Sequence, residues 1–434
     1  MPAFASTPNC EIKGSFSVSG SSELMALPSS PFACVHFIEA IRSELGGVVS
    51  AVIDVCRAVA SRGHRVIVAT CDGTDAPAEW RSAAAGSPQL VELSPSVLTG
   101  KLISGAGVAC FGQLLKGVDV AHLHTPWSLG NYQLSKTLRS AQVPYVVSVH
   151  GMLDHYSMQK KSLKKHAFLR LGGRRLFRDA TAVHFTAEEE RTQALHYIPG
   201  ADRAVVEPCL VDLSPYDRLP GPELALQTFP QLSAEGPRLL FLSRVHPKKG
   251  VDLLIRAAAE LRASFPQLQV FIAGPGDDGY LADLRNLATE LGVGASTHFL
   301  GMVRGETKLS LYQAADVFVL PTHQENFGIV LPEAMACGLP VVTTRGTDIW
   351  RELQQGGVSI VDANPSEIAA GVAEILRNPA KAAAMSVQGA AFVRKWLDAE
   401  RLTACYETMY RDVIARGVPP FAAAVASSVA EVTA

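Results

Sequence analysis

The sequence lacks the features that mark membrane-spanning, secreted and zinc-stabilised chains. No stretch approaches the roughly 18 apolar residues that a spanning helix needs. The beginning of the chain lacks the charged-then-apolar order of a secretion signal. None of the eight cysteines belongs to a Cys-x-x-Cys pair, although structural zinc requires clustered ligands. We therefore expect scattered, reduced cysteines in a cytoplasmic protein.

An excess of charge of one sign is also absent. The chain has 39 Lys and Arg against 41 Asp and Glu, a formal net charge of −2. This balance argues against a general nucleic-acid binder and leaves room only for a local basic patch. The composition is typical of globular proteins, with 48% hydrophobic and 18% charged residues in a chain of 434 residues. Such a length suggests two or three domains.

Short apolar runs alternate with helical patterns along the chain. After the first run, valines 48, 52, 55 and 59 recur at helical spacing until Gly63 ends the pattern. This alternation predicts parallel strands that are buried on both faces. The expected strands are 32–38, 64–70, 118–124, 145–151 and 180–186 in a first block, and 238–244, 268–274, 297–301, 316–322 and 339–344 in a second.

A cluster of prolines separates the two blocks. Seven prolines stand between positions 199 and 237 without any periodicity, which is typical of a domain boundary. We therefore expect an α/β protein with two doubly wound, Rossmann-like domains that face each other across a cleft. The expected division is a loose tail at 1–31, a first domain at 32–206, a linker at 207–237, a second domain at 238–395, a helix at 396–418 that packs back toward the first domain, and a tail at 419–434.

The stretch HQENFGIVLPEAMACG places two glutamates on either side of an expected helix start. Ligands of doubly wound folds bind outside the carboxyl ends of the strands, and Glu325 is on the loop after such a strand. Glu333 is about one turn inside the helix, where Pro332 costs little. The unpaired amides between the glutamates can hold an anion. A ligand with hydroxyls at both ends and phosphates in the middle, such as a sugar nucleotide, fits this arrangement.

Cations and glycines are expected at the same edge of the sheets. Arg244 ends a strand, and Lys249 stands before a glycine and a helix. A departing diphosphate needs such charges, because its negative charge grows in the transition state. Gly46 and Gly47 follow the first strand and let the backbone approach a ligand closely. Solvated surface side chains and a plain turn are the alternatives for each of these features alone.

Together these stretches resemble the retaining, metal-independent glycosyltransferases of family four (glycosyl transferase group 1), which have the GT-B fold. The resemblance covers about residues 33–415. It is carried by the Gly-Gly loop, by HG at 150–151, and by SRVHPKKGVDLLI, IAGPGDD and QENFGIVLPEAMACGLPVVTT. The stretch GMLDHYSMQKKSLKKH is similar to a loop and helix of bacterial polysaccharide-assembly members.

The resemblance also assigns roles to residues. It implies that Glu325 faces the transferred sugar, that His150 lies beside this sugar, and that Glu333 binds the ribose. It implies a diphosphate clamp of Arg244 and Lys249. The backbone amides that it assigns to the sugar and phosphates are those of Asn326, Phe327, Gly328 and Ile329.

The implied reaction moves a hexose from a UDP- or GDP-hexose to an acceptor hydroxyl, with retention, in polysaccharide or glycolipid assembly. The hydroxyl attacks from the side that the diphosphate leaves, and a phosphate oxygen takes its proton, so neither a protein nucleophile nor a cofactor is needed. Glu325 would counter charge at the anomeric carbon. A double displacement through a nucleophile on the opposite face stays open. No Asp-x-Asp stands at a strand end, so no divalent metal need bridge the diphosphate.

Two stretches depart from the family pattern. The chain reads VEPCLVDL where the family often has Asn-Gly, near the linker. The stretch RGTDIWREL replaces the usual glycine–proline–glutamate turn, and Asp348 and Glu352 are the acidic residues available there. Both departures affect the hinge and the nucleotide side, so the chemistry is better defined than the donor.

Three histidines stand on two neighbouring expected strands. His122 and His124 share one face of a strand, and His150 ends the next. Three imidazoles can ligate a metal, but no His-Glu-x-x-His helix or carboxylate set accompanies them. We therefore predict no metal site. We expect His122 to be a satisfied core residue and His124 to line the acceptor side.

Residues 158–178 form a basic segment, with eight Lys and Arg and no acidic residue. Apolar side chains at 168, 169, 176 and 177 are interleaved with the charges. Such a segment can lie on an anionic membrane or guide a lipid-linked acceptor. The alternative is a solvated helical face. We expect a saccharide or lipid-linked acceptor, and with the membrane role a peripheral position on the inner face of the membrane.

Three other functions stay open. GPGDDG at 274–279 matches the dinucleotide pattern of an NAD-dependent oxidoreductase, but Asp277 and Asp278 would repel a pyrophosphate. The acidic residue that should follow about 20 positions later is also missing. A sugar-nucleotide epimerase of the same fold would need acid–base residues at the sugar and no acceptor pocket. A catalytically inactive binding subunit would not need the combination of Arg244, Lys249 and Glu325.

Overall fold

The computed structural model of the protein describes residues 30–82, 84–97, 102–159, 162–233 and 235–419. Most of the two expected tails, at 1–29 and 420–434, lies outside the described residues, as do Lys160 and Lys161 of the basic segment. No helix in the described part of the chain is long and apolar enough to cross a membrane.

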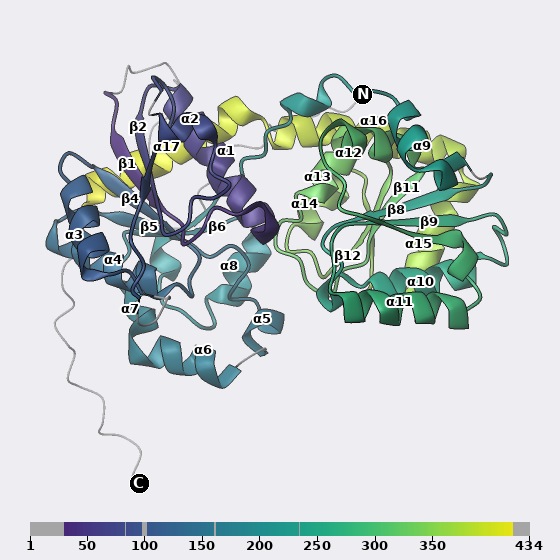
Figure 1. The fold of residues 1–434 in the computed structure, drawn as a ribbon, viewed down its shortest axis with the longest axis horizontal. Helices are drawn as coiled ribbons and strands as arrows, with labels where there is room; N and C mark the ends of the chain where they lie inside the picture. The colour runs from purple at the N-terminus through teal and green to yellow at the C-terminus, as the bar shows by residue number, and fades with distance from the viewer. Residues whose placement is uncertain (1–29, 83, 98–101, 160–161, 234, 420–434) are drawn as a thin grey trace, which may run out of the picture.

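The N-terminal domain is built on a seven-stranded parallel sheet. Its strand order is β3-β2-β1-β4-β5-β6-β7. The strands β2 and β3 are added on one side of β1, and β4 and the later strands on the other side. Helices between the strands cover both faces, so the central strands are buried apolar runs (Figure 1). The strands are β1 Ala33–Phe37, β2 Arg65–Thr70, β3 Gln89–Glu92, β4 Val120–His124, β5 Tyr145–Ser148, β6 Ala182–Phe185 and β7 Ala204–Val206. The helices are α1 Gly47–Ser61, α2 Ala78–Arg81, α3 Gly105–Leu114, α4 Leu129–Ser140, α5 His155–Gln159, α6 Ser162–Phe168, α7 Arg174–Arg178 and α8 Glu188–Ala194, with short turns η1 Ser43–Leu45, η2 Leu169–Gly173, η3 Ala201–Arg203 and η4 Ser214–Tyr216.

The C-terminal domain repeats this plan with a six-stranded sheet. Its order is β10-β9-β8-β11-β12-β13, again all parallel. The strands are β8 Arg238–Leu242, β9 Gln269–Ala273, β10 Thr297–Gly301, β11 Val317–Leu320, β12 Val341–Thr344 and β13 Ser359–Val361. The helices are α9 Glu223–Thr228, α10 Val251–Leu261, α11 Asp278–Glu290, α12 Gly305–Ala314, α13 Val330–Ala336, α14 Trp350–Gln355, α15 Pro365–Arg377, α16 Pro379–Trp396 and α17 Ala399–Arg416, with turns η5 Pro230–Ser233, η6 Pro247–Lys249 and η7 Gly294–Ser296.

This architecture confirms the predicted pair of doubly wound, Rossmann-like domains. All ten expected strands are present, with ends shifted by a few residues. Three further strands, β3, β7 and β13, were not expected from the sequence. Each is a short strand at the edge of its sheet. An edge strand is covered on fewer sides, so its residues need not form the apolar run by which a buried strand is recognised.

The last helix returns from the C-terminal domain to the N-terminal domain. Figure 1 shows α16 on the C-terminal domain and α17 on the N-terminal one, both in yellow. Tyr406 and Tyr410 of α17 are buried in the N-terminal domain, where α17 packs on α1 and β4. Glu407 of the same helix pairs with His64 at 2.9 Å. The C-terminal helix is therefore part of the packing of the first domain.

Candidate active site

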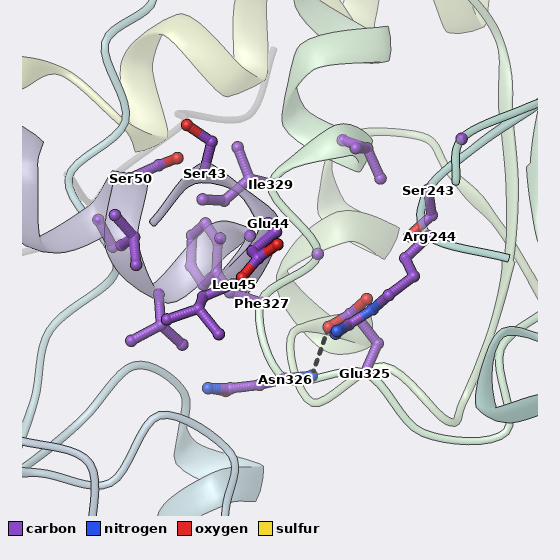
Figure 2. Close-up of a pocket in the computed structure, with 18 of the residues that line it drawn as sticks. Ser43, Glu44, Leu45, Ser50, Ser243, Arg244, Glu325, Asn326, Phe327 and Ile329 are labelled. Carbon is purple, nitrogen blue, oxygen red and sulfur yellow. Dashed lines mark hydrogen bonds between the residues drawn. The ribbon is translucent and has the colours of Figure 1, made fainter. Parts of the chain in front are cut away.

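A cavity of about 810 Å³ lies between the two domains, a size suited to a small-molecule ligand. Both domains line it, and several of its side chains are drawn in Figure 2. The lining includes all but two of the residues assigned to the site from the sequence. The assigned residues that line the cavity are Gly46, Gly47, His150, Arg244, Lys249, Glu325, Asn326, Phe327, Gly328 and Ile329.

The Gly-Gly loop brings the start of α1 close to the opposite domain. Gly46 has a φ of +77°, a conformation that side chains disfavour. A Cβ on Gly47 would stand 3.4 Å from Cδ1 of Ile329, which belongs to the C-terminal domain. The two glycines thus form one wall of the cavity with bare backbone.

A buried carboxylate shapes the turn that carries His150. His150 and Gly151 both have a left-handed backbone, with φ of +53° and +67°. Glu190 accepts hydrogen bonds of 2.6 Å from the N–H of Gly151 and from the N–H of Thr186. Burial raises the pKa of Glu190, while these donors favour its charged form. The turn is tight against the other domain, because a Cβ on Gly151 would overlap the side chain of Asn326.

Two cations and a carboxylate meet on the C-terminal side. Lys249 is buried, and its ammonium forms an ion pair with Glu325. Burial lowers the pKa of Lys249 to about 7, and Lys248 and Arg244 add to this by repulsion. Contact with the Glu325 carboxylate favours the charged form. Figure 2 shows Arg244 reaching from the end of β8 toward Glu325.

The loop of Glu325 is held by the segment after β12. The N–H of Glu325 donates to the carbonyl of Gly346 at 2.8 Å, and the N–H of Asp348 donates to the carbonyl of Glu325 at 2.9 Å. This segment is the one that departs from the family pattern. The side chain of Asp348 does not face the cavity: it is buried and accepts from Gln193 of the N-terminal domain at 3.2 Å. The departure therefore preserves backbone support for the loop.

The same loop presents unpaired backbone donors. The N–H groups of Phe327, Gly328 and Ile329 make no hydrogen bond among the described residues. Gly328 has a φ of +62°, and a Cβ there would stand 2.9 Å from Cγ of Glu325. A glycine is therefore required for the loop to fold back on Glu325. Three free donors beside two cations form a site where an anion with several oxygens can bind.

Two of the residues assigned from the sequence lie away from the cavity lining. Glu333 pairs with Lys308 at 2.8 Å and accepts from the hydroxyl of Tyr312 at 2.9 Å. His124 is 1% exposed and touches the site only through a 3.1 Å hydrogen bond with His150. His122 is also buried and hydrogen bonded at both ring nitrogens.

Three buried histidines lie close enough together to be compared with a metal site. His36, His122 and His124 each offer a ligand atom, and these atoms lie within 4.8 Å of one another. Their ring nitrogens, however, already face partners among the described residues: the other histidines, Ser148 and Tyr410. A metal would have to displace these bonds, so this set does not fit a resident ion.

Several residues of the cavity lining were not expected from the sequence. They follow β9 and β10, where Gly274, Pro275 and residues 302–304 line the same cavity as Arg244. Their position after parallel strands was a usable signal, because the carboxyl ends of such strands meet at one edge. Thr186 directly follows β6 and so had the same signal. Glu190, which holds the His150 turn, had none, because it stands inside α8 and contacts Gly151, which is distant in sequence.

Comparisons with known proteins match both domains of the chain. The model of "Glycosyl transferases group 1" matches residues 227–392, and the model of "Glycosyltransferase Family 4" matches residues 45–215. A D-inositol 3-phosphate glycosyltransferase of Geodermatophilus obscurus is 30% identical over 366 residues, which cover 77% of this chain and 78% of the relative. A GDP-mannose-dependent alpha-(1-6)-phosphatidylinositol monomannoside mannosyltransferase of Mycolicibacterium smegmatis is 36% identical over 162 residues, 35% of this chain and 42% of the relative.

Solved structures share the fold. HepE of Anabaena, solved in complex with UDP and glucose, superposes with a TM-score of 0.71 at 19% identity, over 88% of this chain and 99% of that one. Sucrose-phosphate synthase of Thermosynechococcus elongatus gives a TM-score of 0.74 at 20% identity, over 88% and 100%. At such identities the likeness concerns the fold. By its sequence matches and its two facing domains, the chain belongs to the group 1, family-four glycosyltransferases with the GT-B fold.

Proposed function

We propose that the chain transfers a hexose from a UDP- or GDP-hexose to an acceptor hydroxyl, with retention at the anomeric carbon and without a metal ion. The observation that carries the proposal is the meeting of Arg244, Lys249 and Glu325 with His150 in one cavity between the domains. The described part of this cavity combines an anion site with a carboxylate, which is what a sugar diphosphate requires.

The diphosphate is assigned to the cationic side of the cavity. The guanidinium of Arg244 can chelate two phosphate oxygens, and protonated Lys249 adds a point charge. The free N–H groups of residues 327–329 complete the set. These groups are fixed before the reaction, so they stabilise the growing charge of the leaving diphosphate without reorganisation. In this proposal they take the place of a bridging cation.

The sugar is assigned to the space between Glu325 and His150. The carboxylate of Glu325 would orient the sugar and counter positive charge as the bond to the diphosphate breaks. The acceptor hydroxyl attacks on the face that the diphosphate leaves, and it passes its proton to a phosphate oxygen. In the double-displacement alternative, a nucleophile would attack from the opposite face.

The nucleoside is assigned to the end of the cavity formed by residues 274–275 and 302–304. Glu333 stays the proposed ribose ligand, because residues 329 and 330, about one turn before it, line the cavity. The ribose hydroxyls would then bind the same carboxylate that contacts Lys308 and Tyr312. His124 contacts His150 rather than the open cavity, so its proposed acceptor role is indirect.

A membrane contact of the basic segment is a further part of the proposal. Leu169, Leu176 and Phe177 are buried, but Leu163 and Leu171 are 88% and 85% exposed. The contact would therefore use Leu163 of α6 and Leu171 of η2 with the surrounding cations; α6 lies at the edge of the N-terminal domain (Figure 1). It would place a cytoplasmic protein at the inner face of the membrane, near lipid-linked acceptors. Binding to anionic but not to neutral vesicles, lost in Leu163→Ser with Leu171→Ser, is the expected result, and equal binding to both vesicles contradicts it.

The transfer itself is tested with intact donors in excess EDTA. The names of the relatives give GDP-mannose as a first donor and D-inositol 3-phosphate as the first acceptor. UDP-glucose is the other first donor, because HepE, which shares the fold, was solved in complex with it. Anomeric proton couplings of the product report the configuration. The expected product keeps the configuration of the donor. Inversion would contradict the proposal, and a changed nucleotide sugar without acceptor would instead indicate an epimerase.

A further inference from the structure

The cavity is connected to the C-terminal helix by a chain of buried histidines. His36, His122, His124 and His184 come from three strands of the N-terminal sheet, β1, β4 and β6, and all are buried. His150 follows β5 and is the member that lines the cavity. The strand order β1-β4-β5-β6 makes these positions neighbours across the sheet.

The first half of this chain of hydrogen bonds runs from a backbone carbonyl to α17. Nε2 of His184 lies 3.0 Å from the carbonyl oxygen of Glu207. Nδ1 of His184 lies 2.7 Å from the hydroxyl of Ser148, which lies 2.6 Å from Nε2 of His122. Nδ1 of His122 lies 2.8 Å from the hydroxyl of Tyr410.

The second half runs from α17 to the cavity. The hydroxyl of Tyr410 lies 3.5 Å from Nε2 of His36. Nδ1 of His36 lies 3.1 Å from Nε2 of His124, and Nδ1 of His124 lies 3.1 Å from Nε2 of His150. Nδ1 of His150 has no hydrogen-bond partner among the described residues.

The carbonyl at one end fixes where the protons are. A carbonyl only accepts, so His184 carries its proton on Nε2, and its Nδ1 must accept from Ser148. The oxygen of Ser148 then accepts from Nε2–H of His122. Nδ1 of His122 in turn accepts the proton of the Tyr410 hydroxyl. Each neutral ring has one donor and one acceptor, so every assignment determines the next.

The link between Tyr410 and His36 is the longest, yet it favours the same direction. The single proton of Tyr410 points to His122, so the tyrosine oxygen offers only lone pairs to His36. A lone pair on Nε2 of His36 would face them and be repelled, whereas an N–H is attracted. Nδ1 of His36 is then an acceptor for His124, and Nδ1 of His124 is an acceptor for His150.

We propose that this chain of hydrogen bonds holds His150 in one neutral form, with the proton on Nε2 and a lone pair on Nδ1. Tyr410 and Ser148 are positioning residues that act on His150 through the other histidines. The cavity therefore offers a hydrogen-bond acceptor at this point, and it selects ligands that bring a donor such as a sugar hydroxyl. This last step rests on the proposed function, whereas the protonation pattern does not.

The neutral state that the argument needs is supported by burial. Burial lowers the pKa of His36 and of His150 to about 3, and that of His184 to about 4. Burial, and then repulsion among the rings, also holds the pKa of His122 and His124 well below the ordinary value. At neutral pH each ring thus has one proton to place.

Nitrogen chemical shifts of protein labelled with 15N-histidine test the pattern directly. Protonated and unprotonated imidazole nitrogens have well separated shifts, and His150→Asn identifies the His150 signals. The expected result is a protonated Nε2 and an unprotonated Nδ1. A proton on Nδ1, an even mixture or a doubly protonated ring would overturn the proposal. Shifts typical of a metal-bound ring would overturn it as well.

Tyr410→Phe tests the connection, and Tyr406→Phe is the matched control. Both variants remove one buried hydroxyl from α17. Tyr406 donates to the carbonyl of Pro208 at 3.2 Å, and its oxygen lies 3.5 Å from Nε2 of His184, at the outer end of the path, so it joins no two members of the path to His150. Tyr410→Phe is expected to turn the His150 signals into a mixture of two forms, and Tyr406→Phe to leave them unchanged. Ser148→Ala, which breaks the path elsewhere, should act like Tyr410→Phe if the latter does not fold. An unchanged His150 in a folded path variant would overturn the proposal.

Kinetics separate this inference from the proposed function. With an active donor, Tyr410→Phe should lower kcat about tenfold, the effect of one weakened hydrogen bond, with little change in KM. Tyr406→Phe should leave kcat unchanged. Equal losses in both variants would contradict the positioning role. If the shifts are as expected and no sugar is transferred, the protonation pattern stands and the proposed function fails.

Discussion

Lys249 is a cation whose charge depends strongly on its surroundings. Its pKa is lowered to about 7 by burial and by neighbouring cations. A bound diphosphate stabilises the ammonium, so the pKa in the complex must be higher than in the free protein. At a pH between these two pKa values, Lys249 has lost its proton in the free protein but carries it in the complex. Donor binding should therefore take up a proton, and affinity should fall by up to about tenfold per pH unit above pH 7.

Calorimetry with the intact nucleotide sugar, in buffers that differ in ionisation enthalpy, measures this proton uptake. Lys249→Arg is the control, because a guanidinium keeps its charge in this range. The variant should bind without proton uptake and with little dependence on pH. Proton uptake that is absent in the wild type, or equal in both proteins, would contradict the assignment.

Arg244 and Glu325 have different expected signatures in kinetics. Arg244→Ala removes a charge that matters most as the diphosphate leaves, so kcat/KM should fall about 10²–10³-fold. Arg244→Lys should recover only part of this loss, because it restores the charge and not the fork. Glu325→Ala should abolish transfer, and it also leaves the buried ammonium of Lys249 without its carboxylate. Initial rates at varied donor check these results, and wild-type kinetics in either alanine variant would contradict the roles.

Much of the site at this scale could be predicted because parallel strands bring their carboxyl ends together. Arg244, Glu325 and His150 all follow such ends, and the structure places them in one cavity. Tyr410 and Glu190 could not be found in this way. Their contacts join residues far apart in the chain, and neither residue stands in a pattern that indicates a role.

At the scale of elements, α13 shows how two glycines with similar backbones can differ in purpose. Gly328 stands before the helix and Gly338 after it, with φ of +62° and +72°. A Cβ on Gly328 would meet Glu325, whereas a Cβ on Gly338 would meet nothing within 4 Å. Either change to alanine should cost about 1–3 kcal/mol of stability through the left-handed backbone. Only Gly328→Ala should also displace Glu325 and remove most activity.

Thermal unfolding and transfer rates, measured on both variants, separate the two effects. Activity lost equally in Gly338→Ala would mean that stability alone explains the loss. Full activity in a folded Gly328→Ala would mean that Glu325 does not need this backbone.

The sequence predicted central elements better than peripheral ones. Buried strands such as β8 and β11 are apolar runs, and α1 has valines at helical spacing, so a pattern of hydrophobicity sufficed. The edge strand β3 reads QLVE and is only partly covered, so it left no such pattern. The basic segment was expected to interleave apolar side chains with its charges, on a membrane or as a solvated helical face. In the structure it is α6, a turn at Leu169–Gly173 and α7, with much of its apolar content in the core.

At the scale of the whole molecule, polar side-chain contacts join the two domains. Arg351 of the C-terminal domain pairs with Glu189 of the N-terminal domain at 2.5 Å. Exposed ion pairs contribute no more than about 1 kcal/mol. If this pair favours the closed cleft, Arg351→Ala should raise KM for the donor by at most about fivefold and leave kcat nearly unchanged.

Arg345→Ala is the matched control for this effect. Arg345 is also exposed and also lies over the ring of Trp350, but its partner Asp362 belongs to the same domain. Its KM should stay at the wild-type value. An equal rise of KM in both variants would show that the interdomain pair has no special part in closure.

The relation between the domains was predicted only in outline. A proline cluster indicated the boundary, and strand order explains why the two carboxyl edges can share a ligand. The contacts that set the domains against each other, such as Thr186 with Asn326, depend on side chains that meet only in the folded molecule. The packing of α17, which links the far end of the chain to the histidines, is of the same kind.

Our main proposal is that fixed protein cations and backbone donors, rather than a bound ion, stabilise the leaving diphosphate. Its most direct test is the rate of sugar transfer from the active donor after removal of metals, with and without added magnesium. We predict the same rate in both conditions for the wild-type protein. A rate that vanishes in EDTA and returns with magnesium would contradict the claim.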